Sequence, residues 1–516
     1  MTGSSRSNGM RAAIIFLLSG LSGGYLGCTA LGPEPVEPKA EWLASWKPTL
    51  YGELQKPEAG KAVDLRFWWK LFNDPVLNSL IEAAKAENLD LRVAGLRILE
   101  SRATLGIATS GRYPQLQETT GSIAFVNTQE FGGAAPDSDQ SLVSYNAGFN
   151  LGWELDFWGR FQRGIESAEA AYFSSLYTYH DLQVLLSAQV AELYFAYLTT
   201  RQRIEIARAN AAIQERSFEI TRQLYQSGQS NELDFQQAKT QYQSTLASIP
   251  ELEIALYEIR NALCVLLGRS PGQVPELYAD TGPLPEVDLQ QFADIPGSLL
   301  LRRPDIRASL WRVAVQSAQI GIAEAELYPS ISLAGTIGWS GNSVGASPET
   351  IQLLAGPSFS WNVFDYGRIK NNVRVQDARL QQAIENYRNG LLLAAAEVDD
   401  AGVALVKTKE QAEPLRESLN AAERSLELAT KRYQEGYADF QRVLDSQRAV
   451  ATRMEQELLN RSSQLSAVVQ LYKAIGGGWT EASKDLLLPE TTRETMRNRS
   501  DWGSLLEEPM LELTVE

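Results

Sequence analysis

Histidine and cysteine are scarce in this sequence, which has one histidine and two cysteines among its 516 residues. This scarcity argues against a zinc site built from His and Cys, a disulfide framework or a serine–histidine triad. We find no pattern typical of a nucleotide-binding loop or of a nucleophile with its base, so we expect no enzyme activity, no cofactor and no metal. His180 and Cys264 both fall within helical patterns, where we expect structural roles.

Positive charge is also in deficit. The sequence contains 47 Lys and Arg residues against 63 Asp and Glu residues, and its formal net charge is −16. A nucleic-acid partner normally requires a basic face, so this balance argues against DNA or RNA binding. The hydrophobic content of 44% is nevertheless sufficient for a large buried core.

The N-terminus contains an apolar run, AAIIFLLSGL at residues 12–21, that is too short to span a bilayer and suits the core of a signal peptide. Arg6 and Arg11 precede it. The following SGGYLGC resembles a bacterial lipoprotein box, which implies that Cys28 is acylated and becomes the mature N-terminus. Thr29, rather than an aspartate, follows and favours the outer membrane by the same resemblance. An ordinary signal peptide with an incidental thiol is the alternative.

The chain repeats itself once, with a period of roughly 200 residues. Three pairs of segments match in the same order: ATLGIATSGRYPQL with AQIGIAEAELYPSI, WELDFWGR with WNVFDYGR, and RQLYQSGQSNELD with TKRYQEGYADFQR. Three ordered matches argue against coincidence. Each half therefore predicts a helix, a β-hairpin, a very long helix, a break at glycine and a second long helix.

Each predicted hairpin alternates apolar and small polar residues. The first pairs the segment after residue 114 with residues 143–155, and the second pairs residues 331–339 with residues 355–363. Alternation over about 10 residues with aromatics near the ends is typical of transmembrane β-strands, although a soluble sheet with one covered face has the same pattern. The residues expected on the apolar face of the second hairpin are Ile331, Leu333, Ile337, Trp339, Phe359, Trp361 and Val363.

A heptad stripe dominates the long helix that begins near residue 367. A sustained 3.5-residue period indicates left-handed supercoiling against other helices, and a helix of about 65 residues is on the order of 100 Å long. A tube wall and a solid coiled-coil stalk both satisfy this pattern. Pro414 lies inside the stripe, where we expect it to kink or loosen the helix. The members of the stripe are Leu380, Ile384, Tyr387, Leu391, Ala394, Val398, Ala401, Leu405, Thr408, Ala412, Leu415, Leu419, Ala422, Leu426, Ala429 and Tyr433.

Four strands are too few for a membrane barrel, because about eight form the smallest closed sheet whose interior side chains fill. An open sheet edge is not tolerated in lipid. If these strands span a membrane, several chains must therefore pool them. Two chains would supply eight strands and three would supply twelve, and the residues alone leave both possibilities open.

Five motifs together resemble the outer-membrane efflux proteins, the TolC/OprM-like lipoprotein subunits of tripartite drug-efflux systems. They are WWKLFNDPVLNSLIEAA (68–84), WELDFWGR (153–160), LLLRRPDIRA (299–308), the Tyr-Pro pair before each first strand and LYKAIGGGW (471–479). The resemblance implies a mixed α and β membrane protein that forms a homotrimer. Each chain would contribute four β-strands to a twelve-stranded outer-membrane barrel, which continues into a long α-helical barrel with an equatorial domain.

The same resemblance implies a division of the chain into six parts. The β-hairpins are expected at about 113–157 and 328–365, each followed by a long helical hairpin, at about 158–270 and 366–475. The six parts are a signal peptide (1–27), a lipidated N-terminal segment with an equatorial part (28–80), the first repeat (81–270), an equatorial linker (271–302), the second repeat (303–475) and a C-terminal equatorial segment with an acidic tail (476–516).

Candidate functional residues are expected at the two ends of the long helices. Gly228 and Gly436 would form the tight turns that, in the family, dock the periplasmic adaptor. The places where strand passes into helix would lie at the membrane boundary, with aromatic residues suited to that boundary, a glycine permitting the bend and an arginine outside the lipid. These junction residues are Trp153, Gly159, Arg160, Trp361, Gly367 and Arg368.

By resemblance, Asp445 matches a family aspartate that forms a ring of three at the periplasmic constriction. Carboxylates in such a ring attract cations and raise each other's pKa. A second family aspartate is replaced here by Arg442, so the ring would be weaker or would pair internally. Asp234 and Tyr433 match positions that clamp neighbouring helices in the closed state. A lone helical aspartate is otherwise most simply a solvated residue.

The expected function is a trimeric exit duct in the Gram-negative outer membrane, lipid-anchored and with a long periplasmic extension. It would pass drugs or other small molecules from an RND-type inner-membrane pump and a periplasmic adaptor (membrane fusion) protein. Two alternatives are a duct of the same fold for type I protein secretion and a lipid-anchored structural coiled-coil stalk.

Overall fold

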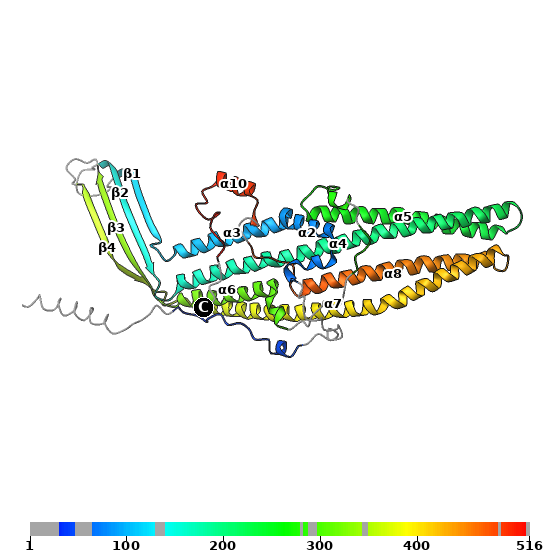
Figure 1. The fold of residues 1–516 in the computed structure, drawn as a ribbon. Helices are drawn as coiled ribbons and strands as arrows, with labels where there is room; N and C mark the ends of the chain where they lie inside the picture. The colour runs from blue at the N-terminus through cyan, green and yellow to red at the C-terminus, as the bar shows by residue number, and fades with distance from the viewer. Residues whose placement is uncertain are drawn as a thin grey trace, which may run out of the picture. The chain divides into compact units, whose positions relative to one another are not determined.

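The computed structural model describes residues 30–46, 64–128, 140–278, 282–286, 297–342, 349–482 and 487–511. The described chain is mostly helical and contains one four-stranded sheet (Figure 1). The predicted signal peptide and Cys28 lie outside the described residues. The chain divides into two compact units, the first formed by Met1–Val36, Arg102–Ala171 and Arg312–Ala383, and the second by Glu37–Ser101, Tyr172–Trp311 and Ile384–Glu516.

The first unit contains the sheet, whose four antiparallel strands follow chain order (Figure 1). Because directly opposed residues share a face, the register puts small and polar residues on one face, among them Asn150 opposite Thr336. The other face is apolar, with Phe149 opposite Ile337. The alternation predicted for both hairpins is thereby confirmed. The strands are β1 (Leu116–Thr128), β2 (Gln140–Leu155), β3 (Ser330–Asn342) and β4 (Thr350–Ser360).

The predicted extent of the last strand is wrong. β4 begins five residues earlier than expected, at Thr350, and ends at Ser360, so Trp361 and Val363 lie beyond the sheet. Ser360 pairs with Ser330. The next residue, Trp361, would have to pair with Pro329, which directly precedes β3. Proline has no N–H to donate to the ladder, so pairing stops there.

The helices come in sets of equal length. α4 and α7 contain 67 residues each, α5 and α8 contain 35 each, and α3 and α6 contain 22 each. The longer helices are α2 (Pro75–Glu87), α3 (Leu89–Ser110), α4 (Arg160–Gln226), α5 (Glu232–Leu266), α6 (Pro304–Ala325), α7 (Arg368–Gln434), α8 (Phe440–Ala474) and α10 (Glu490–Arg499). The short 3-10 helices are η1 (Glu41–Ala44), η3 (Leu65–Phe72), η4 (Pro275–Tyr278) and η6 (Gly297–Arg302).

The heptad stripe of α7 is confirmed, because every member is buried or half-buried. α7 continues through Pro414 to Gln434, so the proline does not end the helix. Its missing N–H leaves the carbonyl of Glu410 without the usual helical donor. Among the described residues, no helix is both long and apolar enough to cross a membrane.

Three of the sequence motifs meet in the second unit. Trp68 is fully buried and stacks on Tyr472, with ring centroids 5.3 Å apart. Arg303 donates from Nη1 to the carbonyl of Ala474 at 2.7 Å. Lys85, just after the first motif, donates to the carbonyl of Gly478 at 2.7 Å, and burial lowers its pKa to about 8. The motifs from residues 68–84, 299–308 and 471–479 therefore build one core.

Candidate functional site

The first junction joins β2 to α4 within a few residues. Gly159 has a φ of +75°, a conformation that L side chains rarely adopt, and α4 begins at Arg160. Asp156 Oδ2 accepts a hydrogen bond from the backbone N of Gln162 at 2.8 Å, which satisfies one of the free donors of the first helical turn. Arg160 forms an ion pair with Glu154 at 2.9 Å.

At the second junction an aspartate again accepts hydrogen bonds at the helix start, but it stands one position later in the motif. Gly367 has a φ of +86°. Asp365 accepts hydrogen bonds from the backbone N of Gly367 at 2.9 Å and of Ile369 at 2.7 Å. These bonds stabilise the carboxylate and lower the pKa of Asp365. Arg368 lies at the helix start, 4.0 Å from Glu326.

The junction tryptophans make equivalent contacts in the two copies. Trp153 Nε1 donates to the carbonyl of Arg112 at 3.2 Å, and Trp361 Nε1 donates to that of Leu327 at 3.0 Å. Each acceptor immediately precedes a Tyr-Pro pair. In each copy, the segment that leads out of the hairpin is thus tied to the segment that leads into it, a contact that the sequence alone did not reveal.

An N-terminal strap, defined as residues 31–34, is held in the first unit by a buried arginine. Arg163, which is 2% exposed, donates to the carbonyl of Leu31 at 2.8 Å and pairs with Glu34 and with Glu166, each at 2.7 Å. The backbone of the strap lies directly against the backbone of α6, since a Cβ at Gly32 would come within 2.5 Å of Gly321. The sequence predictions missed this contact.

The tip turns have the glycine geometry expected from the sequence. Gly228 and Gly436 have φ values of +73° and +79°. Gln229 N donates to the carbonyl of Leu224 at 2.8 Å, and Tyr437 N donates to that of Arg432 at 2.8 Å. This six-to-one bond beside a left-handed glycine ends both α4 and α7 as a Schellman motif.

The two residues predicted to form a clamp are brought together by a serine. Ser230 Oγ donates to Asp234 Oδ2 at 2.9 Å. Burial and the nearby charge of Asp234 raise the pKa of Tyr433, while a hydrogen bond with the Ser230 side chain opposes this rise. Asp234 lies in the first turn of α5 and Tyr433 in the last turn of α7, so the contact links the two helical hairpins within a single chain. Ser230 was not predicted.

Asp445 lies on an exposed face of α8. Its carboxylate accepts from Gln441 Nε2 at 2.9 Å and lies 3.6 Å from Arg448 Nη1. Arg442 instead lies 4.0 Å from Asp439. Asp445 therefore has local partners within α8, and Arg442 is not among those described.

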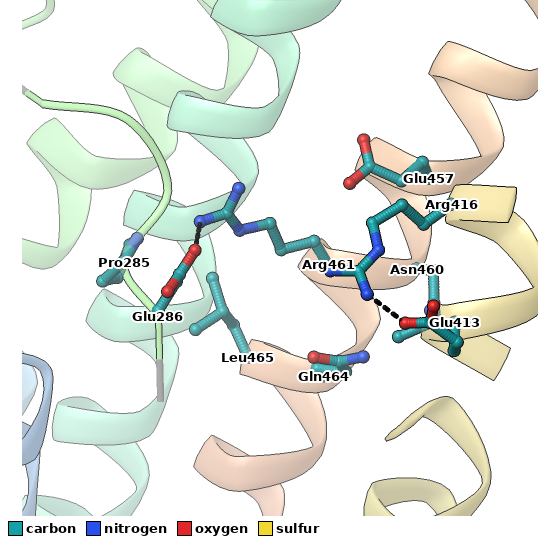
Figure 2. A pocket seen from close by; sticks show the side chains of 10 residues that line it. Pro285, Glu286, Glu413, Arg416, Glu457, Asn460, Arg461, Gln464 and Leu465 are labelled. Carbon is teal, nitrogen blue, oxygen red and sulfur yellow. Dashed lines mark hydrogen bonds and ion pairs between the residues drawn. The ribbon is translucent and has the colours of Figure 1, made fainter. Parts of the chain in front are cut away.

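A groove of about 280 Å³ lies between α7, α8 and residues 285–286 (Figure 2). Figure 2 shows Arg461 reaching Glu286 and Arg416 reaching Glu413. Arg461 Nη2 lies 3.0 Å from Glu286 Oε1. Both guanidinium groups thus have carboxylate partners. Among the described residues, no group of three or more His, Cys, Asp and Glu side chains could hold a metal ion.

The chain matches a model of the outer membrane efflux protein family over residues 80–269 and 295–477. Among curated proteins, it is 30% identical to the probable outer membrane lipoprotein SilC of Salmonella typhimurium, over 88% of this chain and 96% of that protein. It is also 30% identical to the cation efflux system protein CusC of Escherichia coli, over 80% of this chain and 88% of that protein.

Solved structures of outer-membrane channels also resemble this chain. The outer-membrane channel OprN superposes with a TM-score of 0.76 at 30% identity, covering 87% of this chain and 100% of that one. A structure of CusC superposes with a TM-score of 0.71 at 25% identity, over the same shares of the two chains.

Proposed function

Because the chain belongs to the outer membrane efflux protein family, we propose that it forms the homotrimeric exit duct of a tripartite efflux pump. Family membership places it in the outer membrane and among channel proteins rather than enzymes.

The observation that carries the proposal is the sheet with one polar and one apolar face. Ile351, Leu353 and Phe359 on the apolar face are 75%, 77% and 78% exposed in the single chain. Within the described residues, β1 pairs only with β2, and β4 pairs only with β3, so both outer edges are free. Three chains that join β4 of one to β1 of the next would remove every edge. The apolar face would then meet lipid and the polar face would line water.

The helices continue this duct into the periplasm. We propose that α4–α5 and α7–α8 are duplicated hairpins, which their equal lengths support. In this duct the chain would comprise a signal peptide (1–27), a lipidated N-terminal segment with an equatorial part (28–80), the first repeat (81–270), an equatorial linker (271–302), the second repeat (303–475) and a C-terminal equatorial segment with an acidic tail (476–516). The turns at Gly228 and Gly436 would dock a periplasmic adaptor protein, which in turn holds an RND-type inner-membrane pump.

The proposed gate lies on α5, α7 and α8, close to these turns. Asp234 and Tyr433 form the closed-state clamp, supported by their shared contact with Ser230. Asp445 lines the constriction with Arg442 nearby on the same helix. Cys28 carries the lipid anchor, and Trp153, Gly159, Arg160, Trp361, Gly367 and Arg368 mark the membrane boundary.

Relatives differ in the cargo for which they are named. CusC is named for cation efflux, OpmQ of Pseudomonas aeruginosa for pyoverdine export and TtgF of Pseudomonas putida for toluene efflux. Such different cargoes on one architecture support a duct that passes whatever its pump delivers, including drugs and other small molecules.

Purification of the full-length protein from outer membranes tests this proposal. We expect an oligomer of three chains that resists detergent until heated, and ion conductance after its reconstitution in planar bilayers. A monomer, or a folded oligomer without conductance, would contradict the proposed duct and favour a coiled-coil stalk.

A further inference from the structure

The contact between α4 and α8, the helices that join the two hairpins of one chain, is partly polar. Thr199 Oγ1 donates to Ser462 Oγ at 3.0 Å, and Arg203 Nε donates to Glu455 at 2.9 Å. Further along, Gln447 Nε2 donates to Ser217 Oγ at 3.0 Å. The heptad stripe of α7 is mostly apolar by comparison. Hydrogen bonds between side chains therefore contribute to the contact between the two hairpins.

An open groove runs beside this contact. It has a volume of about 350 Å³ and lies between α4, α5 and α8, with Gln214, Thr245, Ala451 and Glu455 among its lining residues. Of these four residues, Thr245, Ala451 and Glu455 are only half-buried. The stretch is therefore polar and is not closed over by apolar packing.

The same stretch contains one buried glutamine on α4 and one on α8. Gln214 of α4 is 4% exposed, and Gln447 of α8 is 6% exposed. The amide oxygen of each has no hydrogen-bond partner among the described residues. Buried amide oxygens are nearly always paired, so each unpaired oxygen calls for a physical reason. An alternative helix position in which new donors reach them supplies one.

The contact between the two hairpins is apolar instead at its end nearest Gly228 and Gly436. We name this the tip cluster: Ala238, Phe440, Val443 and Leu444 are buried, and Phe218, Leu426, Ala429 and Tyr433 pack against them. The cluster contains residues of both hairpins. Phe440 lies beside Tyr433, with ring centroids 5.2 Å apart, so the cluster also supports one half of the proposed clamp.

We propose that Gln214, Ser217, Gln447 and Glu455, with the open groove beside them, form a slip zone along which the hairpins shift when the channel opens, and that the tip cluster holds the closed arrangement. This inference rests on the proposed function. Polar contacts and empty space let helices exchange partners at low cost, whereas a packed apolar cluster has discrete arrangements. The residues here act by positioning the helices, not by contacting cargo.

Filling the groove tests the slip zone. In full-length protein reconstituted in planar bilayers, we expect Ala451→Leu to raise the thermal midpoint and to lower the open fraction by about threefold or more. Ala449→Leu, an exposed position on the same helix, is the matched control and should leave the open fraction unchanged. If leucine overpacks the site and the protein does not fold, Ala451→Val gives the same test with a smaller change.

Weakening the tip cluster should have the opposite effect on the open fraction. Phe440→Ala should raise the basal open fraction, and Phe440→Leu should raise it less because it keeps apolar volume. Stabilisation by Ala451→Leu with an unchanged open fraction would overturn the slip zone. An unchanged open fraction in Phe440→Ala would overturn the role of the tip cluster. Failure of the wild-type protein to conduct would instead contradict the proposed function itself.

Discussion

Arg163 and Glu34 form an ion pair of 2.7 Å across 129 positions of sequence. The arginine is 2% exposed while the carboxylate is 77% exposed, so the strap crosses the surface and the guanidinium reaches it from within. The hydrogen bond from Arg163 lowers the pKa of Glu34. The start of the described chain is thereby fixed to the first turn of α4.

Removal of this buried guanidinium should destabilise the first unit. Arg163→Met keeps much of the side-chain volume but loses the bonds to Leu31, Glu34 and Glu166, at an expected cost of about 2 kcal/mol. Chemical unfolding in detergent measures the loss, and limited proteolysis should show faster cleavage near residue 34. The control is Arg66→Met, because Arg66 pairs with Asp64 at the surface and should be dispensable. Equal stability of the two variants would contradict an anchoring role for Arg163.

The proposed clamp predicts a more open channel when it is weakened. Asp234→Asn should raise the basal open fraction by about tenfold, the change expected from loss of one hydrogen bond to a charged group. Tyr433→Phe should raise it by about fivefold, because its hydrogen bond is with the neutral Ser230 side chain. Single-channel recording measures this fraction. Tyr437→Phe, at a position that is 79% exposed, is the matched control. If the double variant equals the sum of the singles in free energy, the two residues are not coupled.

The proposed constriction predicts a loss of cation preference. Asp445→Asn removes one negative charge per chain from the narrowest point, so the ratio of cation to anion permeability should fall. Reversal potentials in asymmetric salt measure the ratio. Asp90→Asn, at the start of α3, carries the same charge change and should have no effect. Unchanged selectivity in Asp445→Asn would place this residue away from the pore.

Two adjacent residues of α4 predict opposite pH dependences of stability. Burial lowers the pKa of His180 to about 4, while burial and the charge of Asp305 raise the pKa of Asp181 to about 6. The histidine contribution is present above pH 6.5 and is lost as pH falls to 4. The aspartate contribution is present below pH 3.8 and is lost as pH rises through 6.

Each shift corresponds to about 3 kcal/mol, so the two contributions nearly cancel in the wild-type protein between pH 4 and 6.5. His180→Phe should therefore become more stable as pH falls across this range, and Asp181→Asn should become less stable. Thermal unfolding at a series of pH values measures both slopes. Parallel slopes in the two variants would show that these residues do not titrate as described.

Local patterns predicted the elements well because their causes are local. The alternation near Phe149 and the heptads near Leu391 report which faces are covered, whatever covers them. Where pairing ends depends on the partner strand, so the extent of β4 was misjudged at Trp361. Pro329, which directly precedes β3, determines that end.

The site residues that were missed depend on contacts between distant segments. Ser230 lies between Asp234 and Tyr433 only after two hairpins meet. Asp156 and Asp365 have the same capping role but stand one position apart in the aligned motifs, which hides their equivalence. Two signals were available: the polar Gln447 among the mostly apolar buried residues of α8, and Arg163 in the first turn of α4.

The register of the sheet also limits how this protein can evolve. Opposed residues share a face along all four strands, so the insertion of one residue in β2 would turn every following side chain to the wrong face. Lengthening must therefore proceed two residues at a time and must be matched in the neighbouring strands. An adaptation to a thicker bilayer would appear in the gene as paired, even-numbered insertions in both halves.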